Sequence, residues 1–102
     1  MNHTDVPVDL TLRPENSSFW QGCWLRPTGG GAYELVTSPD QATRLFEGNF
    51  RAFLASTLMS ASHVVKLSGQ APPWAYAQAI ALIPPHVPVV CVVEGVDVAI
   101  VR

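Results

Sequence analysis

A short turn in the C-terminal half of the chain carries the residues best suited to hold a small anion. The residues expected to contact such a ligand are Ser68, Gly69, Gln70, Ala71 and Trp74. A strand that runs through a glycine turn into a helix presents backbone N–H groups and a helix N-terminus, which attract negative charge. Pro72 and Pro73 have no N–H group to offer. From spacing alone, an ordinary strand-to-helix connection explains this turn as well.

Two other side chains, those of His86 and Glu94, could move a proton or hold a cation. His86 precedes the apolar segment Val89–Val93, and Glu94 follows it. A five-residue strand spans about 17 Å, so we expect the two side chains to lie apart within one copy of the chain. They could meet across a subunit interface. The alternatives are a loop histidine and a solvent-facing carboxylate in a hairpin turn.

Hydrophobic periodicity predicts the elements that position these residues. Alternating or apolar-rich segments predict strands at residues 6–12, 19–25, 32–36, 63–67, 89–93 and 96–101. Two helices are expected, one after Ser38 and one over residues 73–83. The order is roughly β-ββ-α-β-α-ββ, without repeats or linkers. This order indicates one α/β domain over residues 1–102, with α+β as the alternative.

The first helix has the clearest pattern. Ser38 is a candidate cap, Pro39 suits the first helical position, and Gln41 stands at the capping-box position. An apolar stripe at three- and four-residue spacing predicts a face directed at the core. Its members are Leu45, Phe46, Asn49, Phe50, Phe53, Leu54 and Leu58.

Charge is unusually scarce in this chain. Charged residues make up 14% of the sequence, hydrophobic residues 48%, and the net charge is −2. The low positive charge argues against binding of long nucleic acid. A small domain with so few charged side chains exposes apolar surface, which another copy of the chain can bury. We therefore expect a homo-oligomer, either a dimer or a tetramer.

The remaining signals concern compartment and thiols. Cys23 and Cys91 fit no metal-binding spacing, and both are expected to be buried free thiols in strands. The N-terminus lacks the pattern of a signal peptide. Prolines interrupt the long uncharged segment, which argues against a membrane span. We therefore expect a cytoplasmic protein.

The C-terminal part resembles a small CRISPR-associated family, the ring nucleases of type III systems. The resemblance covers about residues 63–101. It rests on the segment from Val64 to Ala77, on the strand that ends at Glu94, and on the final strand from Val98 to Val101. Members of the family carry a hydrophobic strand, a Ser-Gly-Arg-Gly/Ala-Pro turn, a helix with a tryptophan, a histidine-containing element and a strand ending in an acid.

The resemblance implies an oligomeric, Mn²⁺-dependent phosphodiesterase that holds and cleaves cyclic tetra-adenylate between subunits and so ends antiviral signalling. It implies His86 as the base and Glu94 as the metal ligand. The chain departs from the family at the turn, where Gln70 stands in place of arginine, and after the acidic residue, where Val96 does. Two alternatives remain: a protein that binds the cyclic nucleotide without cutting it, as a sink or sensor, and a protein–protein interaction module.

Overall fold

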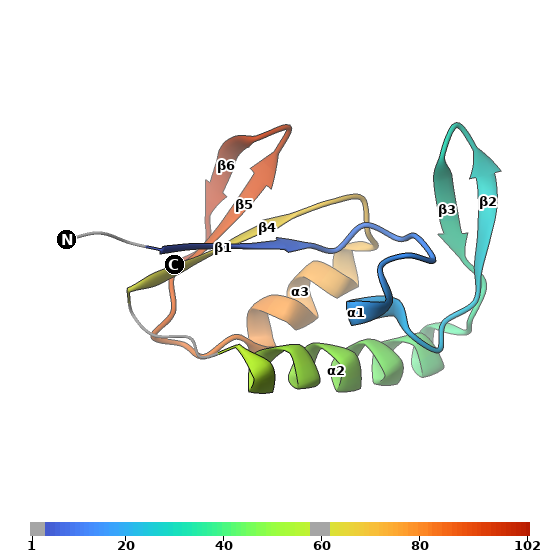
Figure 1. Ribbon diagram of the computed structural model, residues 1–102, viewed down its shortest axis with the longest axis horizontal. Helices are drawn as coiled ribbons and strands as arrows, with labels where there is room; N and C mark the ends of the chain where they lie inside the picture. Colours follow the sequence, from blue (N-terminus) through green and yellow to red (C-terminus); the bar gives the residue numbers. More distant parts are fainter. Residues whose placement is uncertain (1–3, 58–61) are drawn as a thin grey trace.

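A four-stranded sheet forms the centre of the computed structural model, which describes residues 4–57 and 62–102 (Figure 1). Its strands, in spatial order, are β1 (Thr4–Asp9), β4 (His63–Ser68), β5 (Val89–Val93) and β6 (Val96–Ile100). The first three run parallel, and β6 returns antiparallel to β5. The prediction of an α/β fold is confirmed.

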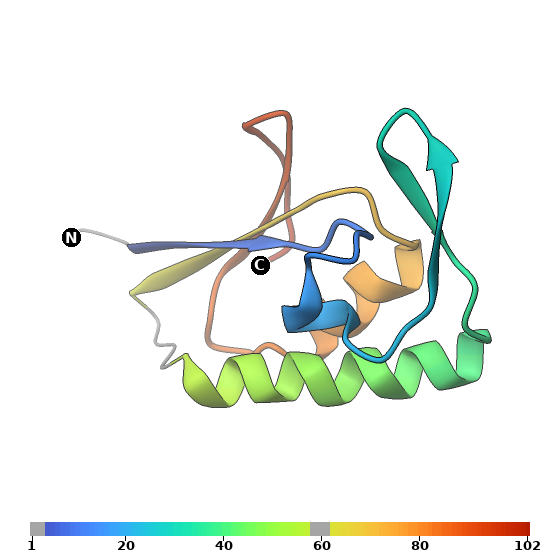
Figure 2. The same cartoon turned by 45° about the vertical axis from the view of Figure 1, so that its right-hand side comes forward.

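The three described helices lie on one side of this sheet (Figures 1 and 2). They are α1 (Ser17–Trp20), α2 (Pro39–Ser56) and α3 (Pro73–Leu82). The connections from β1 to β4 and from β4 to β5 step in the same direction across the sheet. Because such parallel crossovers are almost always right-handed, both place their helices on the same face. None of the helices formed by residues 4–57 and 62–102 covers the opposite face.

The core lies between the sheet and the helices. On β4, Val65 and Leu67 are fully buried toward the helices, whereas Val64 and Lys66 alternate onto the open face. Phe46 and Phe50 of α2 are also fully buried, and their rings stack at 5.6 Å between centroids. Burial of such a ring contributes about 2–3 kcal/mol, so the apolar stripe of α2 fixes the helix on the sheet.

The start of α2 differs in one detail from the prediction. Pro39 occupies the first helical turn as expected, but Ser38 makes no side-chain cap bond, so the capping box with Gln41 does not form. The backbone of Ser38 instead accepts the N–H of Ala42 at 2.8 Å. Leu58, predicted on the apolar stripe, lies outside the described residues.

The predicted strand over residues 19–25 is wrong. Phe19 and Trp20 form the helical turn α1, where both side chains are buried. The indole Nε1 of Trp20 donates to the carbonyl of Leu10 at 2.9 Å, and its ring lies 5.1 Å from that of Phe46. These contacts with the core outweigh the preference of aromatic residues for β-strands.

Two hairpins complete the structure and project away from the helices (Figure 2). One is the separate pair β2 (Leu25–Gly29) and β3 (Ala32–Leu35), and the other is β5–β6. The predicted turn at Glu94 and Gly95 is confirmed. Both residues have positive φ, 52° and 77°, as two-residue hairpin turns of type I′ require.

The cysteines are free, as predicted, but only half-buried. Cys23 lies in the loop before β2, and Cys91 lies within β5. Partial burial raises the pKa of the Cys23 thiol, so it stays protonated at neutral pH.

Candidate functional site

The carboxyl ends of β1 and β4 meet at one edge of the sheet because these neighbouring strands run parallel. Past the strands the two segments stay side by side. The N–H of Leu10 donates to the carbonyl of Ser68 at 2.8 Å, and that of Leu12 donates to Gln70 at 3.0 Å. Ligands of open α/β sheets commonly bind outside the carboxyl ends of the strands. We call this region, residues 9–16 and 68–74, the carboxyl edge.

Gly69 allows the two segments to approach this closely. Its φ is +103°, a conformation that residues with a side chain rarely adopt. A Cβ atom at this position would lie 2.5 Å from Thr11 Oγ1 and 2.6 Å from Thr11 N, and would also meet Asp9. The carbonyl of Gly69 accepts the hydroxyl of Tyr76 at 2.5 Å, which ties the turn to α3. Partial burial, with nearby Cys91 and Asp9, raises the pKa of Tyr76 and keeps this donor protonated.

Asp9 organises the other half of the carboxyl edge. Its Oδ1 accepts the N–H of Thr11 at 2.9 Å and the hydroxyl of Thr11 at 2.5 Å. Its Oδ2 pairs with Nη2 of Arg13 at 2.7 Å. Partial burial alone would raise the pKa of Asp9, but the Thr11 bonds and the Arg13 charge outweigh it and lower that pKa. Asp9 is thus an ionised structural acceptor, not a group that takes up protons at neutral pH.

The loop after β1 is closed by Asn16. Its Nδ2 donates to the carbonyls of Asp9 and Thr11, both at 2.9 Å. The sequence prediction missed this cluster because it extended the strand to residue 12, whereas β1 ends at Asp9. Asp9 and Thr11 form a turn in which the carboxylate bonds the backbone two residues ahead. The sequence signal that could have predicted this turn is an aspartate two residues before a threonine.

The five predicted ligand-contact residues are divided between the surface and the core. Gln70 is exposed, and Ser68, Gly69 and Ala71 are half-buried. Trp74 points into the aromatic core, where its ring meets those of Trp20 and Phe46 edge-on, each at 5.8 Å between centroids. The turn residues therefore share the carboxyl edge, while the Trp74 ring contacts the core that supports it.

Several backbone positions at this edge offer no free N–H group. Pro72 and Pro73 have none, the N–H of Ala75 is bonded to Pro72, and that of Gln70 lies 3.3 Å from Thr11 Oγ1. A side-chain cation would therefore strengthen the binding of an anion here. Arg13 supplies one, with its side chain 44% exposed. It borders a small hollow of about 260 Å³ with Asp9, Glu15 and Asn16.

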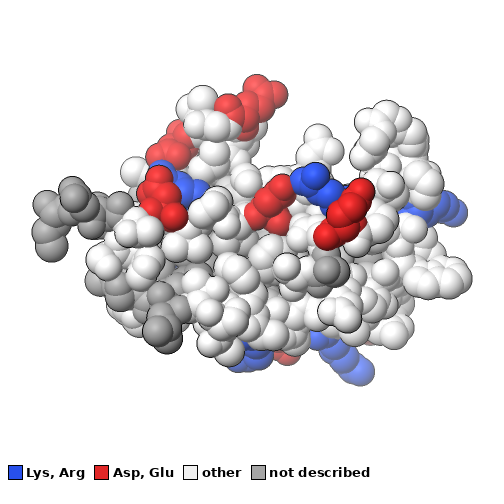
Figure 3. Space-filling view, viewed as in Figure 1, with Lys and Arg blue, Asp and Glu red and all other residues white. Residues whose placement is uncertain are grey.

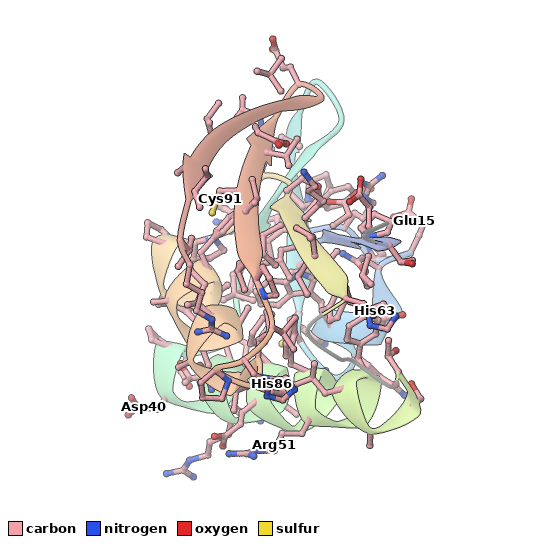
Figure 4. The ribbon with its side chains drawn as sticks, turned by 90° about the vertical axis from the view of Figure 1, so that its left-hand side faces the viewer. Glu15, Asp40, Arg51, His63, His86 and Cys91 are labelled. Carbon is pink, nitrogen blue, oxygen red and sulfur yellow. The ribbon has the colours of Figure 1, made fainter. Side chains whose placement is uncertain are left out.

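His86 and Glu94 lie at opposite ends of β5, as the sequence predicted. His86 lies in the loop before the strand, at the end of the β5–β6 pair nearest α2 (Figure 4). Glu94 lies in the turn at the far end. Both residues are exposed. Within one copy of the chain, the structure does not bring them together.

On the face shown in Figure 3, acidic and basic side chains gather mainly along the upper part of the view, and much of the remaining surface is uncharged. On the open face of the sheet, Lys66 Nζ pairs with Asp97 Oδ2 at 2.8 Å. Across residues 4–57 and 62–102, no three His, Cys, Asp or Glu residues gather into a group that could hold a metal ion. In the same part of the chain, no helix combines the length and the apolar character needed to cross a membrane.

Comparison of the chain with protein-family models, curated proteins and solved structures found no match.

Proposed function

We propose that the protein binds cyclic tetra-adenylate at the carboxyl edge and acts as a ring nuclease of type III CRISPR signalling. The observation that carries the proposal is the position of the Ser68–Trp74 turn. The turn follows the central strand β4, opens α3 and lies beside the end of β1. This is the order of elements that the sequence resemblance implies, at the edge where α/β folds commonly bind ligands.

Arg13 would supply the positive charge that Gln70 does not. The two residues belong to segments joined by the Leu12–Gln70 backbone bond and by Thr11, which contacts both Asp9 and Gln70. A guanidinium group suits a phosphate because it presents several donors in one plane. Ser68 and Gln70 add side-chain hydrogen-bonding groups beside it.

Cleavage would require two copies of the chain. His86 of one copy takes the proton from a ribose 2′-hydroxyl, whose oxygen attacks the adjacent phosphorus. The bond to the 5′-oxygen breaks, that oxygen takes a proton from water, and a cyclic 2′,3′-phosphate end remains. Much of the rate of such a step comes from holding the attacking 2′-oxygen in line with the bond that breaks, next to a base. Because β5 runs parallel to β4, Glu94 follows the carboxyl end of β5 and His86 precedes its amino end, so a ligand at the carboxyl edge of one copy would meet His86 of the second copy.

The Mn²⁺ ion that the resemblance implies does not fit a single copy. Glu94 is one exposed carboxylate, and the described residues place no second and third ligand around it. The proposal therefore assigns no step to a metal.

The test is incubation of the purified protein with cyclic tetra-adenylate, with and without Mn²⁺, followed by chromatography of the nucleotide. We expect conversion to linear di-adenylate that is lost in His86→Ala and Glu94→Ala. Binding should weaken about tenfold in Arg13→Gln and stay unchanged in Arg51→Gln, which alters an exposed ion pair on α2. Cleavage at the parental rate by His86→Ala would remove the proposed base.

The second candidate function is binding without cleavage, as a sink or sensor. Two features favour binding without cleavage: His86 lies far from Glu94, and Gln70 stands where the resembling family has arginine. Nucleotide that is bound but recovered intact would identify this function. If the protein neither binds nor cleaves the nucleotide, the remaining alternative is a protein–protein interaction module.

A further inference from the structure

Trp24 exposes a large aromatic ring in the loop between α1 and β2. The residue is 75% exposed, whereas Trp20 is buried in the core. The backbone of Trp24 is nevertheless held at both of its polar groups. Its N–H donates to Oγ1 of Thr37 at 2.7 Å, and its carbonyl accepts the N–H of Val36 at 2.8 Å. An exposed ring on a fixed backbone loses little conformational entropy when a ligand stacks on it.

Trp24 lines a hollow of about 600 Å³, a volume within the range of small-molecule sites. Gln21 and Pro14 line the same hollow. The loop that forms its wall is fixed to α2, because Nδ2 of Asn49 donates to the carbonyls of Phe19 and Gln21, both at 3.0 Å. The wall therefore has a defined position before any ligand binds.

The hollow lies next to the carboxyl edge. Pro14 lines it, and the neighbouring Arg13 borders the smaller hollow where the phosphate is proposed to bind. Asn16 connects the two, since its N–H donates to the carbonyl of Arg13 and its carbonyl accepts the N–H of Trp20. The loop after β1, α1 and the β2–β3 hairpin lie at the same end of the molecule (Figures 1 and 2). The two hollows therefore suit the phosphate and the base of one nucleotide.

The chemistry of the hollow beside Trp24 suits a base rather than a phosphate. Among the described residues, none that lines it is acidic, basic or a histidine. An indole ring stacks on any base. A glutamine side chain can accept a hydrogen bond from N6 of adenine and donate one to N7. Gln21 is exposed at the hollow and supplies such an amide.

We propose that this hollow binds an adenine base of cyclic tetra-adenylate, with the indole of Trp24 stacked on the base and Gln21 bonded to N6 and N7. The inference rests on the proposed function, because it concerns the same ligand. It extends the site into the N-terminal half of the chain, outside the segment that carries the sequence resemblance. Because stacking on an indole does not distinguish the bases, Gln21 provides the preference for adenine.

The first experiment measures the affinity for cyclic tetra-adenylate by isothermal titration calorimetry, in a His86→Ala background so that the ligand stays intact. Trp24→Leu should bind about tenfold more weakly, because it removes the stacking surface. Trp24→Phe should retain most of the affinity, since its ring still stacks. Ile100→Ala is the control, because Ile100 is also an exposed apolar residue but lies on the other hairpin, and it should bind unchanged. Circular dichroism verifies the fold of each variant.

Tryptophan fluorescence tests the stacking directly. Trp24 is the most exposed of the three tryptophans, since the other two rings pack edge-on in the core. Saturation with the nucleotide should quench the emission of Trp24, and Trp24→Phe should abolish this quenching. The wild-type chain should also bind cyclic tetra-uridylate more weakly than the adenylate ring, and Gln21→Leu should reduce the difference.

The results separate this inference from the proposed function. A wild-type chain that does not bind cyclic tetra-adenylate would overturn both. If the wild-type chain binds the nucleotide but Trp24→Leu binds it equally well, or the quenching persists in Trp24→Phe, only the base site is wrong. An unchanged preference for adenine in Gln21→Leu would remove the role assigned to Gln21.

Discussion

At the level of single residues, Gly69 and Asp9 determine whether the carboxyl edge can form. Asp9 holds Thr11 and Arg13 in place, and Thr11 lies directly against Gly69. The contact leaves no room for a Cβ atom, and the positive φ of Gly69 adds a second reason for glycine. The sequence prediction identified the glycine as part of a turn. It could not reveal the neighbour that makes the glycine necessary, because that neighbour lies 58 positions earlier.

We expect Gly69→Ala to lower the free energy of unfolding by about 2–4 kcal/mol, since both the backbone conformation and the contact with Thr11 oppose a methyl group. Urea denaturation measures the change. Gly48→Ala is the matched control, because Gly48 lies in α2 with no atom within 4 Å of the added Cβ. That variant should gain about 0.5–1 kcal/mol from helix propensity. Equal effects in the two variants would contradict the role assigned to Gly69.

At the level of elements, local sequence patterns predicted the helices and hairpins whose formation depends on a single segment of the chain. The apolar stripe around Phe46 and Phe50 predicted α2, and the Glu94–Gly95 turn predicted the last hairpin. The same reasoning failed for residues 19–25, because Phe19 and Trp20 pack into a core that also contains residues of β1, α2 and α3. The polar cluster after β1 was missed for a different reason. Its bonds are local, between residues two to seven positions apart, but the predicted strand was carried on to residue 12, whereas β1 ends at Asp9.

The end of α3 is held by a contact that no local pattern predicts. The guanidinium of Arg102 donates to the carbonyls of Ile80, Ile83, Pro84 and Val87, at 2.8 to 3.3 Å. These include carbonyls at the C-terminus of α3, where a positive charge is favourable. The contact joins the segment after β6 to the helix and to the loop that carries His86.

Arg102→Ala should therefore lower the free energy of unfolding by about 1–2 kcal/mol, because it removes several hydrogen bonds to carbonyls. Arg102→Lys should recover only part of this, since an ammonium group cannot reach several carbonyls in one plane. Arg51→Ala removes a surface ion pair on α2 and should change stability by less than about 0.5 kcal/mol. Urea denaturation of the three variants measures the order. An Arg102→Ala protein as stable as Arg51→Ala would show that this contact contributes nothing.

At the level of the whole molecule, the separation of His86 and Glu94 makes a prediction about activity. If catalysis needs both side chains, each catalytic centre takes His86 from one copy and Glu94 from another. His86→Ala and Glu94→Ala are then each inactive alone, but a mixture contains mixed dimers. One centre in each mixed dimer has both native side chains.

Equal mixing produces mixed dimers as about half of the population, with one intact centre in two, so the mixture should reach about one quarter of the wild-type rate. The measurement is the rate of cyclic tetra-adenylate cleavage after the two variants are denatured together and refolded. A double variant, His86→Ala with Glu94→Ala, refolded with the wild-type chain is the matched control, since its mixed dimers contain no centre with both native side chains. Cleavage by each single variant at the wild-type rate would contradict the need for both residues. If the single variants are inactive and their mixture stays inactive, the two side chains act within one copy. The last hairpin would then have to change its fold, because β5 separates the two side chains by about 17 Å.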